Sequence, residues 1–104
     1  MNAVSEDVAK LVEKELESAN ERFEQFHSEH EGWAVMQEEA EELREECENV
    51  EMAMEQIWHR IRIGLPTATY AALVEQTAEA AACEAIQVAA MAQKYLDMLE
   101  RADE

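Results

Sequence analysis

The chain has 104 residues, enough for one domain with a modest core, and residues 1–104 are expected to form a single domain. Its 25 acidic and 8 basic residues give a net charge of −17, which argues against direct binding to a nucleic-acid backbone. Only two Gly and one Pro interrupt a composition dominated by helix-forming residues, so the sequence predicts an all-α fold.

Neither a membrane span nor a signal peptide is predicted. No uncharged run of about 18 residues exists, and no basic segment precedes an apolar one. Cys47 and Cys83 lie inside helical patterns, without the spacing of zinc ligands or of a disulfide framework. We expect both to be small core residues in a reducing compartment, which indicates a cytoplasmic location.

The first predicted helix begins at an N-cap, Ser5, and has Glu6 and Asp7 near the positive end of its dipole. It is expected to end near His27 and Ser28, before a polar linker that leads to Gly32. Its apolar residues recur in steps of three or four, as one face of a helix requires: Val8, Val12, Leu16, Ala19, Phe23 and Phe26.

The second predicted helix runs from about Glu31 or Trp33 to Ile61. Alternating steps of four and three form a heptad-like seam, which is typical of a long bundle or coiled-coil contact. Gly64, Leu65 and Pro66 then break the chain, and Thr67 or Thr69 is the next N-cap. The seam consists of Met36, Ala40, Leu43, Cys47, Val50, Met54, Ile57 and Ile61.

The third predicted helix continues to about Arg101 and is rich in alanine, which allows close approach of other helices on more than one side. Three helices in one chain cannot cover two apolar faces of the last one. We therefore expect an antiparallel bundle of three long helices completed by homo-oligomerisation, as a homodimer or a tetramer.

One carboxylate interrupts the apolar third helix. Glu84 is the only charge on its stripe, and an unpaired carboxylate is costly to bury, so it should meet a cation or a proton. A second acidic group lies in the segment 38–42 of the preceding helix. Oxygen-rich clusters of this kind suit Mg²⁺ or Mn²⁺, and the alternative is a solvated acidic face. The stripe is Leu73, Thr77, Ala81, Glu84, Val88, Met91 and Tyr95.

Three short segments carry a family resemblance: Gly32-Trp33-Ala34-Val35, then Glu38-Glu39-x-x-Glu42-Leu43, then EAIQVAAMA, which begins at Glu84. Together they resemble the MazG-like all-α nucleoside triphosphate pyrophosphohydrolases, and most closely the small phage and prophage members. The similarity covers roughly residues 27–99.

The resemblance implies Mg²⁺-dependent hydrolysis of a nucleoside or deoxynucleoside triphosphate to a monophosphate and pyrophosphate, with the base and the sugar left open. The sequence departs from the family at Gln87, which stands where the family has Asp. A Gln carbonyl can coordinate a metal, but it carries no charge and cannot act as a base. The implied metal ligands are Glu38, Glu39, Glu42 and Glu84, with Gln87 beside them.

Further residues have candidate roles in this reaction. Glu39 and Glu46 are placed to orient the attacking water, while Arg60 and Lys94 offer cations to phosphates and Trp33 offers a ring to a base. The alternative hypothesis is that the protein is not an enzyme. It would then be a helical interaction protein of the same fold, whose acidic face binds a basic partner.

Overall fold

The computed structural model describes residues 3–102, which form three α-helices and no strand. These are α1 (Ser5–Arg22), α2 (Glu29–Ile63) and α3 (Ala68–Ala102). The predicted all-α class is confirmed. Within the described residues, no helix combines the length and the apolar character that crossing a membrane requires.

Helix α1 is shorter than predicted. It begins at Ser5, preceded by Val4 as N-cap without a side-chain hydrogen bond, so the prediction of Ser5 as N-cap was wrong. It ends at Arg22, because Phe23 adopts an extended backbone. The following residues are held on α3 instead: the Gln25 side-chain amide donates to the Lys94 carbonyl (3.1 Å).

Helix α2 begins slightly earlier than predicted, because Ser28 is its N-cap and accepts a hydrogen bond from the Glu31 N–H (3.1 Å). It ends at Gly64, whose φ of 73° is the left-handed conformation that glycine adopts without strain. The Leu65 N–H donates to the Arg60 carbonyl (2.9 Å) and closes this turn. Helix α3 then starts directly after Thr67, one of the two predicted N-caps.

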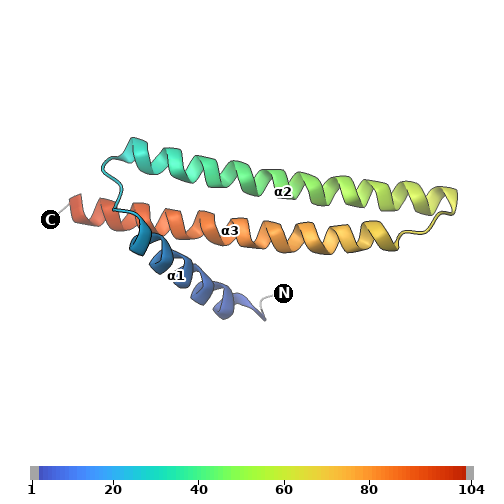
Figure 1. The fold of residues 1–104 in the computed structure, drawn as a ribbon, viewed down its shortest axis with the longest axis horizontal. Coiled ribbons are helices and arrows are strands. Elements are labelled where there is room, and N and C mark those ends of the chain that lie inside the picture. Colours follow the sequence, from blue (N-terminus) through green and yellow to red (C-terminus); the bar gives the residue numbers. More distant parts are fainter. Residues whose placement is uncertain (1–2, 103–104) are drawn as a thin grey trace.

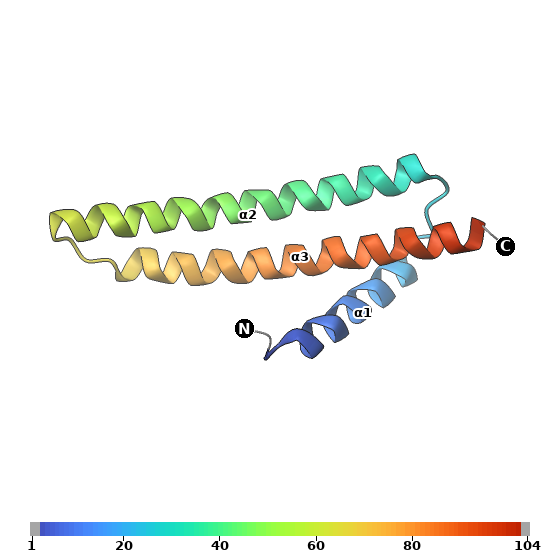
Figure 2. The ribbon, with the colours of Figure 1, turned by 180° about the vertical axis from the view of Figure 1, so that it is seen from behind.

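Helices α2 and α3 lie side by side along their lengths, and the chain turns back on itself through residues 64–67 (Figures 1 and 2). Helix α1 crosses one half of α3 obliquely and, within the described residues, packs against α3 and not against α2. The result is an elongated molecule of 64 × 29 × 23 Å.

Gly32 marks the closest approach of α2 to its neighbours. A Cβ at this position would lie 2.5 Å from the Tyr95 ring and 3.0 Å from the Phe26 ring. Phe26 is itself buried, with 7% of its surface exposed. The absence of a side chain at Gly32 is therefore what allows both rings to pack against this turn of α2.

The buried core of one chain is small. Among the described residues only Phe26, Ala53 and Ala90 are buried apolar side chains. The accessible surface is 7939 Å², whereas a compact monomer of 11.9 kDa exposes about 6,000 Å². Several large apolar side chains are exposed, and the molecule is elongated.

The apolar seam predicted for α2 is only partly covered in a single chain, with Met36, Ala40, Leu43, Val50 and Ile57 half-buried. Met54 and Ile61 are 52% and 56% exposed, while the buried residues of α2 are Gly32 and Ala53, about a quarter of a turn away. Cys47 on the seam and Cys83 on α3 are both exposed, so the expectation that they are core residues was wrong for a single chain.

Candidate metal centre

Three of the predicted carboxylates converge between α2 and α3. Glu39 and Glu42 are one turn apart on α2, and Glu84 faces them from α3. Each offers a carboxylate oxygen, and these three oxygens lie within 4.8 Å of one another. We call Glu39, Glu42 and Glu84 the carboxylate cluster.

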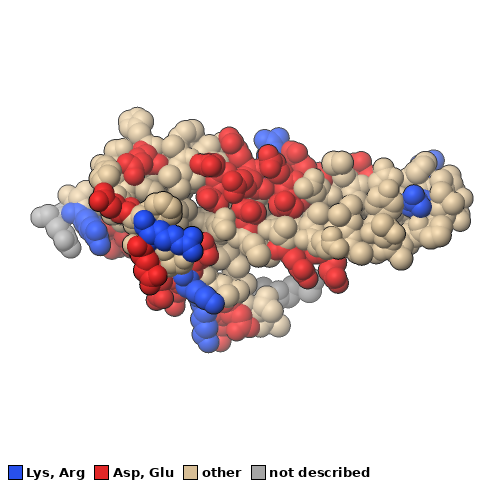
Figure 3. Space-filling model, viewed as in Figure 1, with Lys and Arg blue, Asp and Glu red and all other residues tan. Residues whose placement is uncertain are grey.

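The cluster belongs to a larger acidic surface. Acidic side chains gather around the middle of α2, whereas the end of the pair near residues 64–67 shows mainly uncharged side chains on this face (Figure 3). The spacing of i and i+3 along α2 aligns Glu39 and Glu42 on one side. The close pairing of the two long helices brings Glu84 opposite them.

The negative charges of the carboxylate cluster are unfavourable in the part of the chain that the structure describes. Burial raises the pKa of Glu39, and the negative charges of Glu42 and Glu84 raise it further. Burial also raises the pKa of Glu84, with added contributions from the hydrogen bond and the charge of Glu42. Glu39 and Glu84 are both half-buried. A proton or a cation would relieve this cost.

Gln87 lies beside the cluster, where the motif places it. One terminal atom of its amide is 2.8 Å from a Glu39 oxygen and 3.2 Å from a Glu84 oxygen. With nitrogen in that position, the amide donates a hydrogen bond to each carboxylate. With oxygen there, a fourth oxygen joins the cluster, an arrangement that only a cation between them stabilises.

Two other predicted acids lie near the cluster without joining it. Glu38 is exposed and stands outside the converging oxygens, although its charge contributes to the raised pKa of Glu39. Glu46 is partly exposed and its charge contributes to the raised pKa of Glu84. Glu46 is therefore close to the α3 side of the cluster.

Arg60 is far from the cluster in the same chain. It follows Glu42 by 18 positions in α2, or about 27 Å along the helix. Its guanidinium donates to the Pro66 carbonyl (3.3 Å) and lies 4.9 Å from the centre of the Tyr70 ring. These contacts give Arg60 a role in the turn between α2 and α3. Trp33 is also apart from the cluster: it is exposed and borders a shallow hollow with Tyr95.

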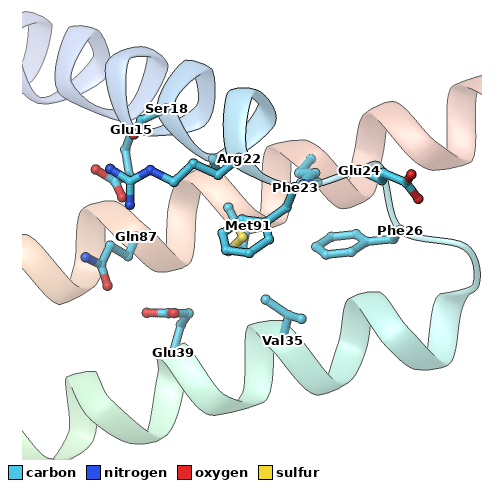
Figure 4. Close-up of a pocket in the computed structure, with 12 residues that line it drawn as sticks. Glu15, Ser18, Arg22, Phe23, Glu24, Phe26, Val35, Glu39, Gln87 and Met91 are labelled. Atoms are coloured by element: carbon cyan, nitrogen blue, oxygen red, sulfur yellow. The ribbon is translucent and has the colours of Figure 1, made fainter.

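A cavity of about 340 Å³ opens next to the cluster (Figure 4). Glu39 and Gln87 stand at one end of it, and α1 covers one side. The residues between are largely apolar, and Lys94 is part of the lining. The cavity is lined by Glu15, Ser18, Ala19, Arg22, Phe23, Glu24, Phe26, Val35, Glu39, Gln87, Met91 and Lys94.

Sequence reasoning missed most of this cavity. Its apolar wall includes Phe23 and Phe26, which the periodicity assigned to the inner face of the first helix. The available signal was the spacing of Gln87, Met91 and Lys94, which places all three on one face of α3. Nothing in the local pattern indicates that the segment after Arg22 leaves the helix.

Comparison with protein-family models, with curated proteins and with solved structures gives no match for this chain. The family resemblance therefore remains a prediction from the motifs.

Proposed function

We propose that the protein is a MazG-like hydrolase that cleaves a nucleoside or deoxynucleoside triphosphate to a monophosphate and pyrophosphate, with Mg²⁺ or Mn²⁺ as cofactor. The observation that carries this proposal is the convergence of Glu39, Glu42 and Glu84, with oxygens within 4.8 Å of one another. Three carboxylates from two facing helices, with raised pKa values for two of them, suit a divalent cation.

The donor set fits a hard cation. Glu39, Glu42 and Glu84 supply carboxylate oxygens, and Gln87 can add a neutral one by turning its amide. The bound cation would neutralise phosphate charge at an acidic surface (Figure 3) that would otherwise repel it. In this proposal Glu46, whose charge acts on Glu84, accepts a proton from the attacking water, and Glu39 is the alternative.

We also propose that a second copy completes the molecule as an antiparallel helical bundle. The seam of α2 is partly exposed, and the surface exceeds that of a compact monomer by about 2,000 Å². Stable interfaces bury about 1,200–2,000 Å² or more in total. A homodimer pairing this seam would cover Met54 and Ile61, and a tetramer would repeat such contacts.

The second candidate function is a non-catalytic interaction protein whose acidic face binds a basic partner. The observation that favours it is Gln87, which gives the cluster one carboxylate fewer than the family motif has. The acidic surface around the middle of α2 would be the binding face (Figure 3).

A nucleotide panel separates the two candidates. Release of pyrophosphate is measured for ribo- and deoxynucleoside triphosphates with Mg²⁺, with Mn²⁺ and with EDTA. We expect metal-dependent release by the wild type and none by Glu42→Gln. Glu51→Gln is the matched control, because Glu51 is an exposed acid on the same helix. Absence of release from every nucleotide, together with no effect of metal on melting temperature, would leave the interaction protein as the better description.

A further inference from the structure

Lys94 is a buried cation without an anionic partner. It lies on α3 with 2% of its surface exposed, and it is the one charged side chain classed as buried among the described residues. Its ammonium is 5.1 Å from the centre of the Phe26 ring. The ion pairs and side-chain hydrogen bonds of residues 3–102 do not include this ammonium. A buried charge held only by a ring face is incompletely compensated.

Lys94 borders the cavity next to the carboxylate cluster. Lys94 and Phe26 both line that cavity. Within the described residues, no fully sealed side-chain nitrogen or oxygen lacks a hydrogen-bond partner. The unpartnered ammonium is therefore not fully sealed, and the Phe26 ring beside it forms part of the cavity wall.

The cavity has two chemically different ends. Gln87 and Glu39 stand at the cluster end, while Lys94 is seven residues further along α3, or about 10 Å along the helix. Between them the wall is formed by Phe23, Phe26 and Met91. At about 340 Å³ the cavity is at the small end of the range for ligand pockets. It therefore suits one flat, largely apolar group rather than a whole nucleotide.

We propose that this cavity holds the nucleobase of the substrate and that Lys94 selects guanine. This assignment rests on the proposed function, since the triphosphate would lie at the carboxylate cluster and the base would extend along α3 toward Lys94. A lysine ammonium has donors and no acceptor. Guanine presents two adjacent acceptors, O6 and N7, to such a donor. Adenine presents N7 beside an amino donor, cytosine presents an amino donor, and uracil presents the single acceptor O4.

The test measures binding of free nucleosides, which carry no phosphate and need no metal. Guanosine, adenosine, cytidine and uridine are titrated into the wild type, and the Met91 methyl signal is followed by NMR. We expect guanosine to bind about tenfold more tightly than adenosine. In Lys94→Met, which keeps the length and apolar packing of the side chain, this preference should fall to within about twofold.

Two variants serve as controls. Lys94→Arg keeps a donor cation and should retain the guanosine preference. Lys10→Met removes an exposed lysine of α1 that does not line the cavity and should change nothing. Melting temperatures establish that each variant is folded.

The outcomes are separable from those of the hydrolysis assay. Guanosine binding that depends on Lys94, without hydrolysis of any nucleotide, supports the base site and contradicts the enzyme. Equal binding of all nucleosides by the wild type overturns the base site. The base site is also overturned if Lys94→Met lowers hydrolysis of all four triphosphates equally and leaves nucleoside binding unchanged. That result would assign Lys94 to phosphate binding instead.

Discussion

The two halves of the α2–α3 pair differ although their secondary structure is the same. In the half near Gly32, α1 and the segment after it cover α3, and the cavity and the carboxylate cluster lie there. In the half near residues 64–67, no third helix of residues 3–102 covers the pair, and large apolar side chains are exposed. The half that α1 covers thus contains the cavity and the carboxylate cluster, and the other half lacks this cover. The exposed side chains of the second half include Met52, Met54, Trp58, Ile61, Ile63 and Leu65.

Removing a carboxylate from the first half should have the largest effect on activity. Glu42→Gln should lower pyrophosphate release at least about 100-fold, because it removes a charged metal ligand. It should also reduce the rise in melting temperature that Mg²⁺ produces by binding only the folded cluster. Glu51→Gln, with the same loss of charge, should leave both unchanged. Equal activity of the two variants would show that the cluster is not the site.

A substitution in the second half should weaken oligomerisation. Light scattering at micromolar concentration should give at least twice the chain mass of 11.9 kDa for the wild type. Ile61→Glu should weaken the association at least about 30-fold, because it places an unpaired carboxylate in an apolar contact. Arg62→Gln is the charge-matched control on the neighbouring exposed residue. A wild type that stays monomeric and well folded would contradict the proposal that the apolar side chains of the second half form an interface between two copies.

Gln87→Asp sharpens the assignment of the first half as a metal centre. Without metal, the added carboxylate replaces an amide that can donate to Glu39 and Glu84, so stability should fall by about 1–3 kcal/mol. With Mg²⁺, the variant should gain more melting temperature than the wild type, because the additional charge attracts the cation. Gln76→Asp on the exposed side of α3 is the control. Equal destabilisation with and without Mg²⁺ would favour the interaction protein.

The smallest expected effect is a pH dependence of the folding stability that arises from Glu39 and Glu84 in the first half. The pKa values of Glu39 and Glu84 are raised from the ordinary value of 4.5, chiefly by burial. The folded state therefore binds protons more tightly than the unfolded state, so stability should rise as pH falls from 7 toward 5 without metal and fall as pH rises through the raised pKa values. Glu84→Gln should show a smaller gain than the wild type in thermal melts. Glu51→Gln should retain the full gain, and a gain lost equally in both variants would point to general charge repulsion.

The sequence predicted the helices well because their signals are local. Caps, breakers and periodicity define α2 and α3 through residues within a turn or two of each boundary, such as Ser28 and Gly64. The motifs also identified Glu39, Glu42 and Glu84, because spacing on a helix fixes which side chains share a face. These are the residues that the structure brings together.

The features that the sequence missed depend on contacts between distant segments. Helix α1 ends early while Phe26 packs at Gly32 and Gln25 bonds to the α3 backbone. Burial of Lys94 follows from the same packing, since its own segment gives no reason to bury a cation. The angular position of α3 relative to the seam of α2 is likewise a tertiary property, which left Cys47 exposed against expectation.

The tight packing at Gly32 links the separation of the helices to the shape of the cavity. The Phe26 ring, which a Cβ at Gly32 would meet at 3.0 Å, also lines the cavity and lies against the Lys94 ammonium. A methyl group at Gly32 would force the Tyr95 ring, 2.5 Å away, to move and would press on the Phe26 ring at 3.0 Å, which forms part of the cavity wall. The shape of the cavity thus depends on a backbone position that has no side chain of its own.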